Sequence, residues 1–95
     1  MSKDIVIENI NTPTAFGVAL KRLRKNSGVS QDQLAHLLNM RQATISDIEN
    51  GRGTLESLFK VIQALKINLV LSNSSFTKDK DHKSKARKIL DLLND

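Results

Sequence analysis

Residues 30–51 read SQDQLAHLLNMRQATISDIENG and carry the signals of two short helices joined by a tight turn. Ser30 offers a side-chain oxygen that can cap a helix start, and Gln33, three residues later, completes a capping box. Asn39 follows the first helix, and asparagine tolerates the left-handed conformation in which helices commonly end. The first helix is therefore expected between Ser30 and Asn39.

A second helix is expected from about Gln42 to Asn50, because Gly51 follows as a helix-ending residue. Apolar residues recur at helical spacing on both sides of the turn, so the two helices can share one apolar seam. The residues expected on this seam are Leu34, Ala35, Leu38, Met40, Ile45 and Ile48. Such a pair of helices is typical of a helix-turn-helix motif.

The outer face of the second helix carries short polar and methyl groups, which fit the major groove of DNA. A glutamine can bond an adenine edge in two places, and alanine or threonine methyls can contact thymine. The residues predicted to read bases are Gln42, Ala43, Thr44 and Ser46.

The stretch resembles the Xre/lambda-repressor-like helix-turn-helix family. The match runs through Gln31, Leu34, Ala35, Leu38, Met40, Ile45, Ser46, Ile48, Glu49 and Gly51. Asn39 departs from the family, which usually has glycine there. The resemblance implies that Gln31 braces Gln42, as in the paired glutamines of phage repressors, and that Glu49 is structural.

In this family the N-terminal ends of the two helices point at phosphates. Free N–H groups and the helix dipole favour anions at such ends. Ser30 and Gln31 are therefore predicted to contact phosphate, together with Arg41 as the cation just before the second helix of the pair. Arg52 is also predicted to contact phosphate, because in such proteins the loop after this helix, here residues 51–53, often touches the backbone of the DNA.

Two further helices are expected to flank the motif. Thr12 and Pro13 open a helix that runs to about Asn26. Its predicted core face consists of Phe16, Ala19, Leu20 and Leu23, and its predicted outer cluster of Lys21, Arg22, Arg24 and Lys25. Thr54 caps the other helix, LESLFKVIQALK, whose predicted core face consists of Leu55, Leu58, Phe59, Ile62 and Leu65.

An uncharged run at 67–72, INLVLS, predicts a short strand. A lone strand leaves its hydrogen-bonding edges open, so it is expected to pair with a second copy, with the β-branched run at 5–10, or with both. The residues assigned to dimerisation are Ile67, Leu69, Val70 and Leu71. The alternative is a strand that only covers the monomer's core. Residues 1–11 are expected to form an edge strand or a loosely ordered arm.

The C-terminal part is expected to be a linker over 73–83 and an amphipathic helix over 84–95. Apolar residues recur there at helical spacing. Those assigned to binding a partner are Ala86, Ile89, Leu90 and Leu93. A helix this short needs a surface to lie on, either this protein's own dimer or a groove on another protein.

The composition limits the class of protein. Ninety-five residues with 39% hydrophobic content fit one small domain, and a formal net charge of +5 favours an anionic partner such as nucleic acid. There is no cysteine and no glycine-rich phosphate loop. Neither His36 nor His82 has a nucleophile or metal-ligand neighbour at meaningful spacing. We therefore expect no metal site, no cofactor and no enzymatic activity. No signal peptide is recognised, and a cytoplasmic location is expected.

The predicted fold is mainly α: a lambda-repressor-like helix-turn-helix domain of four core helices, at 12–72, with a short terminal strand and a C-terminal amphipathic helix. The chain has a narrower resemblance to HipB-type antitoxins, carried by Arg41, the run 42–46, the pair Glu49 and Asn50, and the terminal strand. Dimers of these antitoxins bind operator DNA and hold a HipA-type serine/threonine kinase toxin. This resemblance implies that the protein is a repressor and the antitoxin of a type II toxin-antitoxin system. The alternatives are a phage-type or metabolic repressor without a toxin, and a protein-interaction module.

Overall fold

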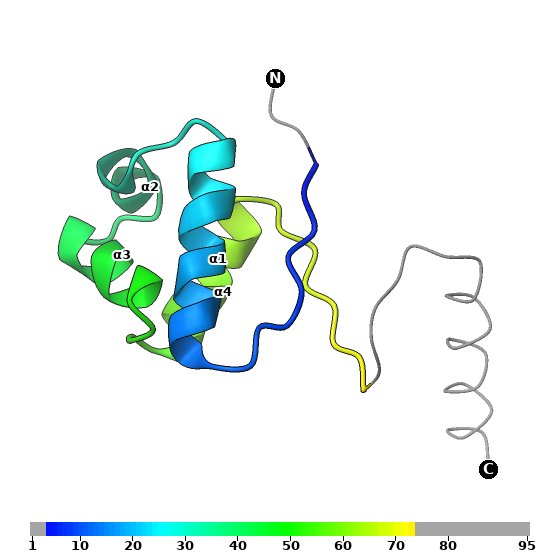
Figure 1. The fold of residues 1–95 in the computed structure, drawn as a ribbon. Coiled ribbons are helices and arrows are strands. Elements are labelled where there is room, and N and C mark those ends of the chain that lie inside the picture. Colours follow the sequence, from blue (N-terminus) through cyan, green and yellow to red (C-terminus); the bar gives the residue numbers. More distant parts are fainter. Residues whose placement is uncertain (1–3, 74–95) are drawn as a thin grey trace, which may run out of the picture.

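The computed structural model describes residues 4–73 and contains four helices within this range (Figure 1). They are α1 (Pro13–Asn26), α2 (Gln31–Leu37), α3 (Gln42–Glu49) and α4 (Leu55–Ala64). In Figure 1, α2 and α3 lie on one side of α1, and α4 lies behind it. The mainly helical architecture is confirmed. The predicted C-terminal helix with Ala86, Ile89, Leu90 and Leu93, and the linker apart from residue 73, lie outside the described residues.

Three of the four helices, α1, α2 and α4, start at the predicted side-chain caps. The Thr12 hydroxyl accepts a hydrogen bond from the Ala15 N–H at 3.0 Å. Ser30 and Gln33 form the reciprocal capping box, with distances of 3.0 and 2.8 Å. Thr54 accepts from the Ser57 N–H at 3.1 Å. These bonds satisfy N–H groups that a helix start leaves without a partner.

The four helices also share one kind of ending. The chain turns into the left-handed region just after each helix, and the next N–H donates to a carbonyl five residues back. After α2, for example, Met40 N donates to Ala35 O at 2.8 Å. The left-handed residues are Gly28 (φ 74°), Asn39 (φ 55°), Gly51 (φ 83°) and Lys66 (φ 56°). Asn39 thus adopts the predicted conformation without being glycine.

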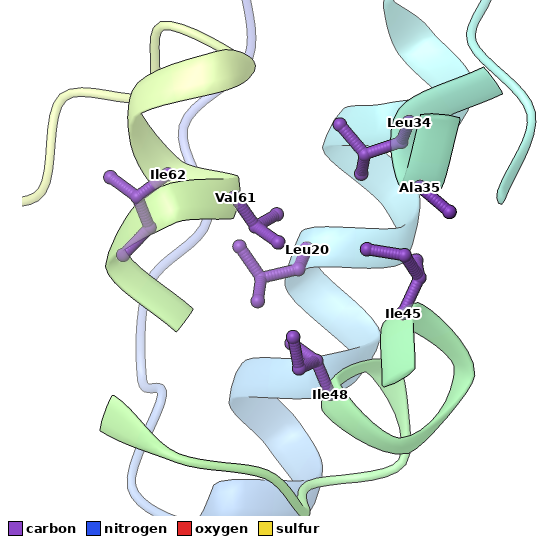
Figure 2. Close-up of a cluster of buried hydrophobic side chains, with 7 residues drawn as sticks. All are labelled: Leu20, Leu34, Ala35, Ile45, Ile48, Val61 and Ile62. Carbon is purple, nitrogen blue, oxygen red and sulfur yellow. The ribbon is translucent and has the colours of Figure 1, made fainter. Parts of the chain in front are cut away.

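Side chains from all four helices form the core (Figure 2). Its buried members are Leu20, Leu34, Ala35, Ile45, Ile48, Val61 and Ile62. The core face predicted for α4 is partly wrong, because Leu55 is 68% exposed and Phe59 41% exposed. The buried stripe instead passes through Val61 and Ile62, so α4 is rotated relative to the prediction and leaves these two side chains at the edge of the stripe.

The two β-branched runs do not form strands within residues 4–73. Asn9 adopts a left-handed φ of 63°, which interrupts the extended run at 5–10. The run at 67–72 is extended but forms no ladder with the rest of the described chain, and a strand exists only through such pairing. The predicted strand is therefore wrong for the single chain, and its pairing with a second copy stays a prediction. In Figure 1 both segments lie on the side of the domain away from α2 and α3.

Among the residues assigned to dimerisation, Ile67 differs from the rest. It is half-buried and packs against the domain's own core. Leu69, Val70 and Leu71 are exposed, by 38%, 49% and 90%. Ile67 therefore serves the monomer, and the other three side chains remain available to another chain.

Gly17 lies where α1 and α3 cross, and it is buried. A Cβ at this position would lie 2.6 Å from the carbonyl carbon of Glu49 and 2.8 Å from the Ile48 carbonyl oxygen. Both atoms belong to backbone, which cannot turn aside as a flexible side chain can. The close approach of α1 to α3 therefore depends on the absence of a side chain at residue 17.

We expect Gly17→Ala to lower the free energy of unfolding by about 2 kcal/mol, because the helices must separate to admit the methyl group. Val18→Ala is the matched control, since Val18 is 59% exposed and should change stability by less than about 0.5 kcal/mol. The chain has neither tryptophan nor tyrosine, so urea unfolding is followed by circular dichroism. Equal unfolding midpoints for the two variants would contradict the expectation.

Candidate nucleic-acid interface

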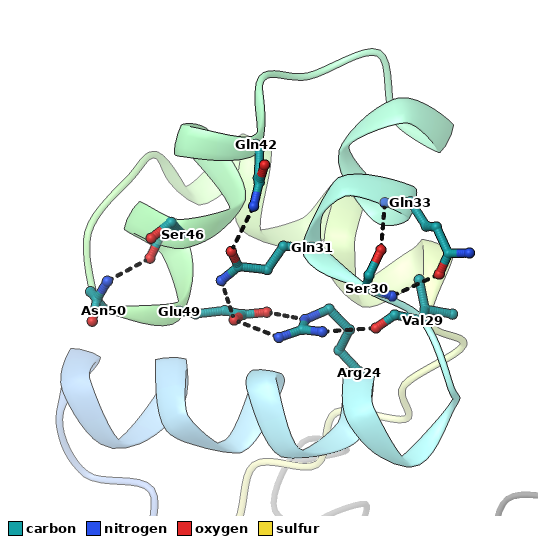
Figure 3. A network of polar contacts seen from close by, with 9 residues as sticks. All are labelled: Arg24, Val29, Ser30, Gln31, Gln33, Gln42, Ser46, Glu49 and Asn50. Carbon is teal, nitrogen blue, oxygen red and sulfur yellow. Dashed lines mark hydrogen bonds and ion pairs between the residues drawn. The ribbon is translucent and has the colours of Figure 1, made fainter.

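A buried ion pair joins α1 to α3 beneath the outer face of the helix pair (Figure 3). Arg24 Nε lies 2.6 Å from Glu49 Oε2, and Arg24 Nη2 donates to Glu49 Oε1 at 3.1 Å. Arg24 also donates to the Val29 carbonyl at 2.8 Å. The prediction that Arg24 lies in an outer basic cluster is wrong: the residue is 5% exposed, because its charge is neutralised by a carboxylate that comes from another helix.

Two glutamines continue this contact toward the surface (Figure 3). Gln31, the first residue of α2, donates from Nε2 to Glu49 Oε1 at 2.9 Å. Gln42, the first residue of α3, donates from Nε2 to Gln31 Oε1 at 3.3 Å. The structure thus places the predicted pair of glutamines in contact. A continuous path of polar contacts runs from α1 to the first turn of α3, and we call Arg24, Glu49, Gln31 and Gln42 the polar relay.

The surroundings of Glu49 keep its carboxylate ionised. Burial alone would raise the pKa of Glu49, but the hydrogen bonds from Arg24 and Gln31 and the positive charges of Arg24 and Lys21 outweigh this effect. The pKa of Glu49 therefore lies below its ordinary value. At neutral pH the carboxylate can only accept hydrogen bonds.

The predicted base-reading residues differ in exposure. Gln42 and Ala43 are exposed on the first turn of α3, whereas Thr44 and Ser46 are half-buried. The Ser46 carbonyl accepts a hydrogen bond from Asn50 Nδ2 at 2.9 Å. The exposed first turn of α3 therefore presents an amide and a methyl group.

Three of the residues predicted to contact phosphate lie at the starts of α2 and α3, and the fourth, Arg52, lies in the loop that follows α3. Ser30 and Arg41 are the N-terminal cap residues of these helices, and the Arg41 side chain makes no capping bond. The Arg52 side chain is 72% exposed and lies 3.8 Å from Asp47. An exposed ion pair of this length contributes little, so the Arg52 guanidinium remains able to bind another anion. Gln31 differs from these three because its amide is already part of the polar relay.

Residues 4–73 lack the features of two other kinds of site. This part of the chain holds no cluster of three or more His, Cys, Asp or Glu residues that could bind a metal ion. None of its helices combines the length and the apolar character needed to cross a membrane.

Sequence reasoning missed Arg24 and Gly17 as structural residues, although the spacing contained a signal for both. Gly17 is three residues before the core residue Leu20, and Arg24 is four residues after it, so all three lie on one face of α1. An arginine on a core face indicates a buried acidic partner. Its partner, Glu49, is 25 residues away in sequence and comes close only after α1 and α3 pack.

Two short helices that cross at a tight turn, with the second projecting a polar N-terminal face, define a helix-turn-helix domain. Comparison with known proteins agrees with this class. The helix-turn-helix family HTH_3 matches residues 20–71. Antitoxin HipB of Escherichia coli strain K12 is 35% identical over 69 residues, which cover 70% of this chain and 78% of the relative.

Solved structures give the same result. A HipB-O4 20mer complex is 34% identical, with a TM-score of 0.65, and the match covers 73% of this chain and 100% of that chain. A HipA-HipB-O2-O3 complex is 32% identical, with a TM-score of 0.64 and coverage of 73% and 100%. The chain therefore belongs to the helix-turn-helix family that includes the HipB antitoxins.

The lowered pKa of Glu49 predicts how stability depends on pH. A carboxyl group whose pKa is lower in the folded than in the unfolded state stabilises the fold at pH values above its ordinary pKa, here 4.5. This stabilisation is lost as the pH falls through the pKa of the group in the folded state. The free energy of unfolding should therefore decrease on acidification below about pH 4.5. Chemical unfolding at a series of pH values measures this slope.

A double variant, Arg24→Met with Glu49→Met, isolates the contribution of the pair. Apolar residues often replace a buried ion pair without loss of the fold. The double variant should show a shallower acid slope than the wild-type chain. Glu56→Gln is the control, because Glu56 lies in an exposed pair with Lys60 at 3.7 Å and should leave the slope unchanged. An acid slope in the double variant as steep as that of the wild type would rule out Glu49 as its source.

Proposed function

We propose that this protein is a sequence-specific DNA-binding transcriptional repressor, and that it acts as the antitoxin of a type II toxin-antitoxin system. In this role it binds operator DNA as a dimer and neutralises a HipA-type serine/threonine kinase toxin. The observation that carries the DNA-binding part is the hydrogen bond between Gln31 and Gln42, which holds an exposed amide at the first turn of α3.

The first turn of α3 suits the major groove. Gln42 and Ala43 are exposed there, and they supply an amide that can bond a base in two places and a methyl group that can contact thymine. The half-buried Thr44 and Ser46 are proposed as additional base contacts. A relative has been solved as a HipB-O4 20mer complex, which supports the same role for this chain.

Phosphate contacts are proposed for Ser30, Gln31, Arg41 and Arg52. Ser30 and Gln31 lie at the start of α2, where free N–H groups and the helix dipole favour an anion. Arg41 adds a positive charge at the start of α3, and Arg52 follows α3 in the loop. The formal net charge of +5 supports association with a polyanion.

Dimerisation is proposed through the segment 67–72, and Leu69, Val70 and Leu71 support it because they are exposed. This segment lies on the side of the domain away from α2 and α3, so pairing there would leave α3 free (Figure 1). A two-fold dimer would place two α3 helices roughly 34 Å apart on one face of the DNA and would bind a palindromic site.

The antitoxin role rests on the relatives. Identity of 35% to antitoxin HipB and the solved HipA-HipB-O2-O3 complex support a HipA-type partner. We assign partner binding to the amphipathic segment 84–95, through Ala86, Ile89, Leu90 and Leu93. Surfaces outside α3 would then hold the toxin while α3 binds the operator.

We expect Gln42→Ala to reduce the affinity for the operator by about 1–3 kcal/mol, because the variant loses the amide that bonds a base edge. Its affinity for unrelated DNA should be unchanged. Fluorescence anisotropy with labelled duplexes, at one stated salt concentration, measures both affinities. Wild-type affinity of Gln42→Ala for the operator would exclude Gln42 as a base reader.

Arg41→Ala is the companion variant, because it alters the neighbouring residue and removes a charge instead of an amide. It should weaken binding to all sequences and reduce the slope of log affinity against log salt by about one. A changed sequence preference with an unchanged salt slope would contradict a phosphate contact at Arg41.

We expect the tagged full-length protein, purified from its own host, to retain a HipA-type kinase in equal amount, as measured by mass spectrometry. Gln42→Ala is the control and should retain the kinase equally well, because α3 is not assigned to that contact. Purification with DNA but without a kinase would contradict the antitoxin role and leave a stand-alone repressor.

A further inference from the structure

The buried pair of Arg24 and Glu49 determines which group donates and which accepts in each hydrogen bond of the polar relay. Arg24 donates to both carboxylate oxygens of Glu49, at 2.6 and 3.1 Å. The carboxylate has no proton to give, so any further neighbour must donate to it. Gln31 is that neighbour, and its amide nitrogen, 2.9 Å from Glu49 Oε1, must therefore face Glu49.

The orientation of the Gln31 amide in turn determines the orientation of the Gln42 amide. With its nitrogen toward Glu49, Gln31 presents its carbonyl oxygen to Gln42. An oxygen can only accept, so Gln42 must turn its own nitrogen toward Gln31, as it does at 3.3 Å. One N–H of Gln42 is then used, and its exposed edge retains one N–H donor and one carbonyl acceptor.

We propose that Glu49 is a positioning residue for base reading: through Gln31, it turns the amide of Gln42 into the orientation that matches adenine and disfavours guanine. The inference rests on the proposed DNA-binding function and assigns a preferred base to it. Glu49 itself is only 7% exposed, so the proposal assigns it no direct contact with DNA.

The chemistry of the two purines explains the preference. In the major groove adenine offers an acceptor, N7, beside a donor, the N6 amino group, whereas guanine offers two acceptors, N7 and O6. One donor and one acceptor on Gln42 complement adenine. A reversed Gln42 amide, with its oxygen toward Gln31, would expose two N–H groups and so complement guanine.

Glu49→Gln tests the inference because it can reverse the relay. Arg24 Nε donates to Glu49 Oε2 at 2.6 Å, whereas Arg24 Nη2 donates to Oε1 at 3.1 Å. A glutamine there is expected to keep its oxygen on the shorter contact and to turn its nitrogen to Gln31, with loss of the longer contact to Nη2. Gln31 would then accept from residue 49 and donate to Gln42, and the Gln42 amide would reverse. The substitution therefore predicts a change of base preference at a position that residue 49 does not contact.

The experiment uses the full-length chain and DNA selected from random duplexes by the wild-type protein. The base pair that Gln42 reads is the one at which Gln42→Ala loses its preference. Dissociation constants are then measured for duplexes with adenine or guanine at that position. The wild-type chain should prefer adenine by about tenfold or more, and in Glu49→Gln this ratio should shift by about tenfold toward guanine.

Two further variants complete the design. Glu56→Gln makes the same change of charge at an exposed site on α4 and should keep the wild-type ratio. Gln31→Met leaves the Arg24–Glu49 pair intact but removes the bonds to Gln42, so its adenine-to-guanine ratio should fall toward one. This variant decides the question if circular dichroism shows that Glu49→Gln is unfolded.

The outcomes separate the inference from the proposed function. Equal weakening on both duplexes, with an unchanged ratio in Glu49→Gln or Gln31→Met, would show a merely structural role for Glu49 and overturn the inference alone. A wild-type preference for another base at the Gln42 position would also overturn it. A wild-type chain that selects no sequence would overturn the DNA-reading function together with the inference.

Discussion

The ion pair between Arg24 and Glu49 is the contact on which the arrangement of α1, α2 and α3 depends. Removing two charges from water is unfavourable unless each finds a partner, and here both oxygens of Glu49 and three nitrogens of Arg24 are engaged. The backbone of Glu49 also lies against Gly17, so α1 holds this residue through both its main chain and its side chain. The packing of α1 on α3 therefore fixes where α3 lies relative to α1.

This support explains how a domain of modest size can present an ordered polar surface. Side chains at a helix start are usually free to adopt several rotamers, and each must be ordered when a ligand binds. Gln42 is already held by Gln31, which is held in turn by a buried carboxylate. Part of the ordering is thus accomplished during folding, which is the general advantage of a preorganised binding group.

Local signals predicted the helix boundaries well, whereas packing decided the rest. Thr12, Ser30 and Thr54 cap helices as expected, because capping depends on residues within one turn. The burial of Arg24 was missed because its partner lies on another helix. The core face of α4 was displaced from Leu55 toward Val61, because a broad apolar stripe allows more than one rotation about the helix axis. The run at 67–72 could not be assigned from sequence, since a strand is defined by what it pairs with.

Two neighbouring exposed residues at the start of α3 differ in how they are held: Gln42 is hydrogen-bonded into the polar relay, and Ala43 is not. Gln42 bonds directly to Gln31 and through it is linked to Glu49 and Arg24, so a change at Gln42 affects a set of contacts that reaches α1. Ala43 is exposed beside it and takes no part in these hydrogen bonds. A substitution at residue 43 would therefore change the exposed surface of the first turn of α3 while leaving the contacts between α1, α2 and α3 intact.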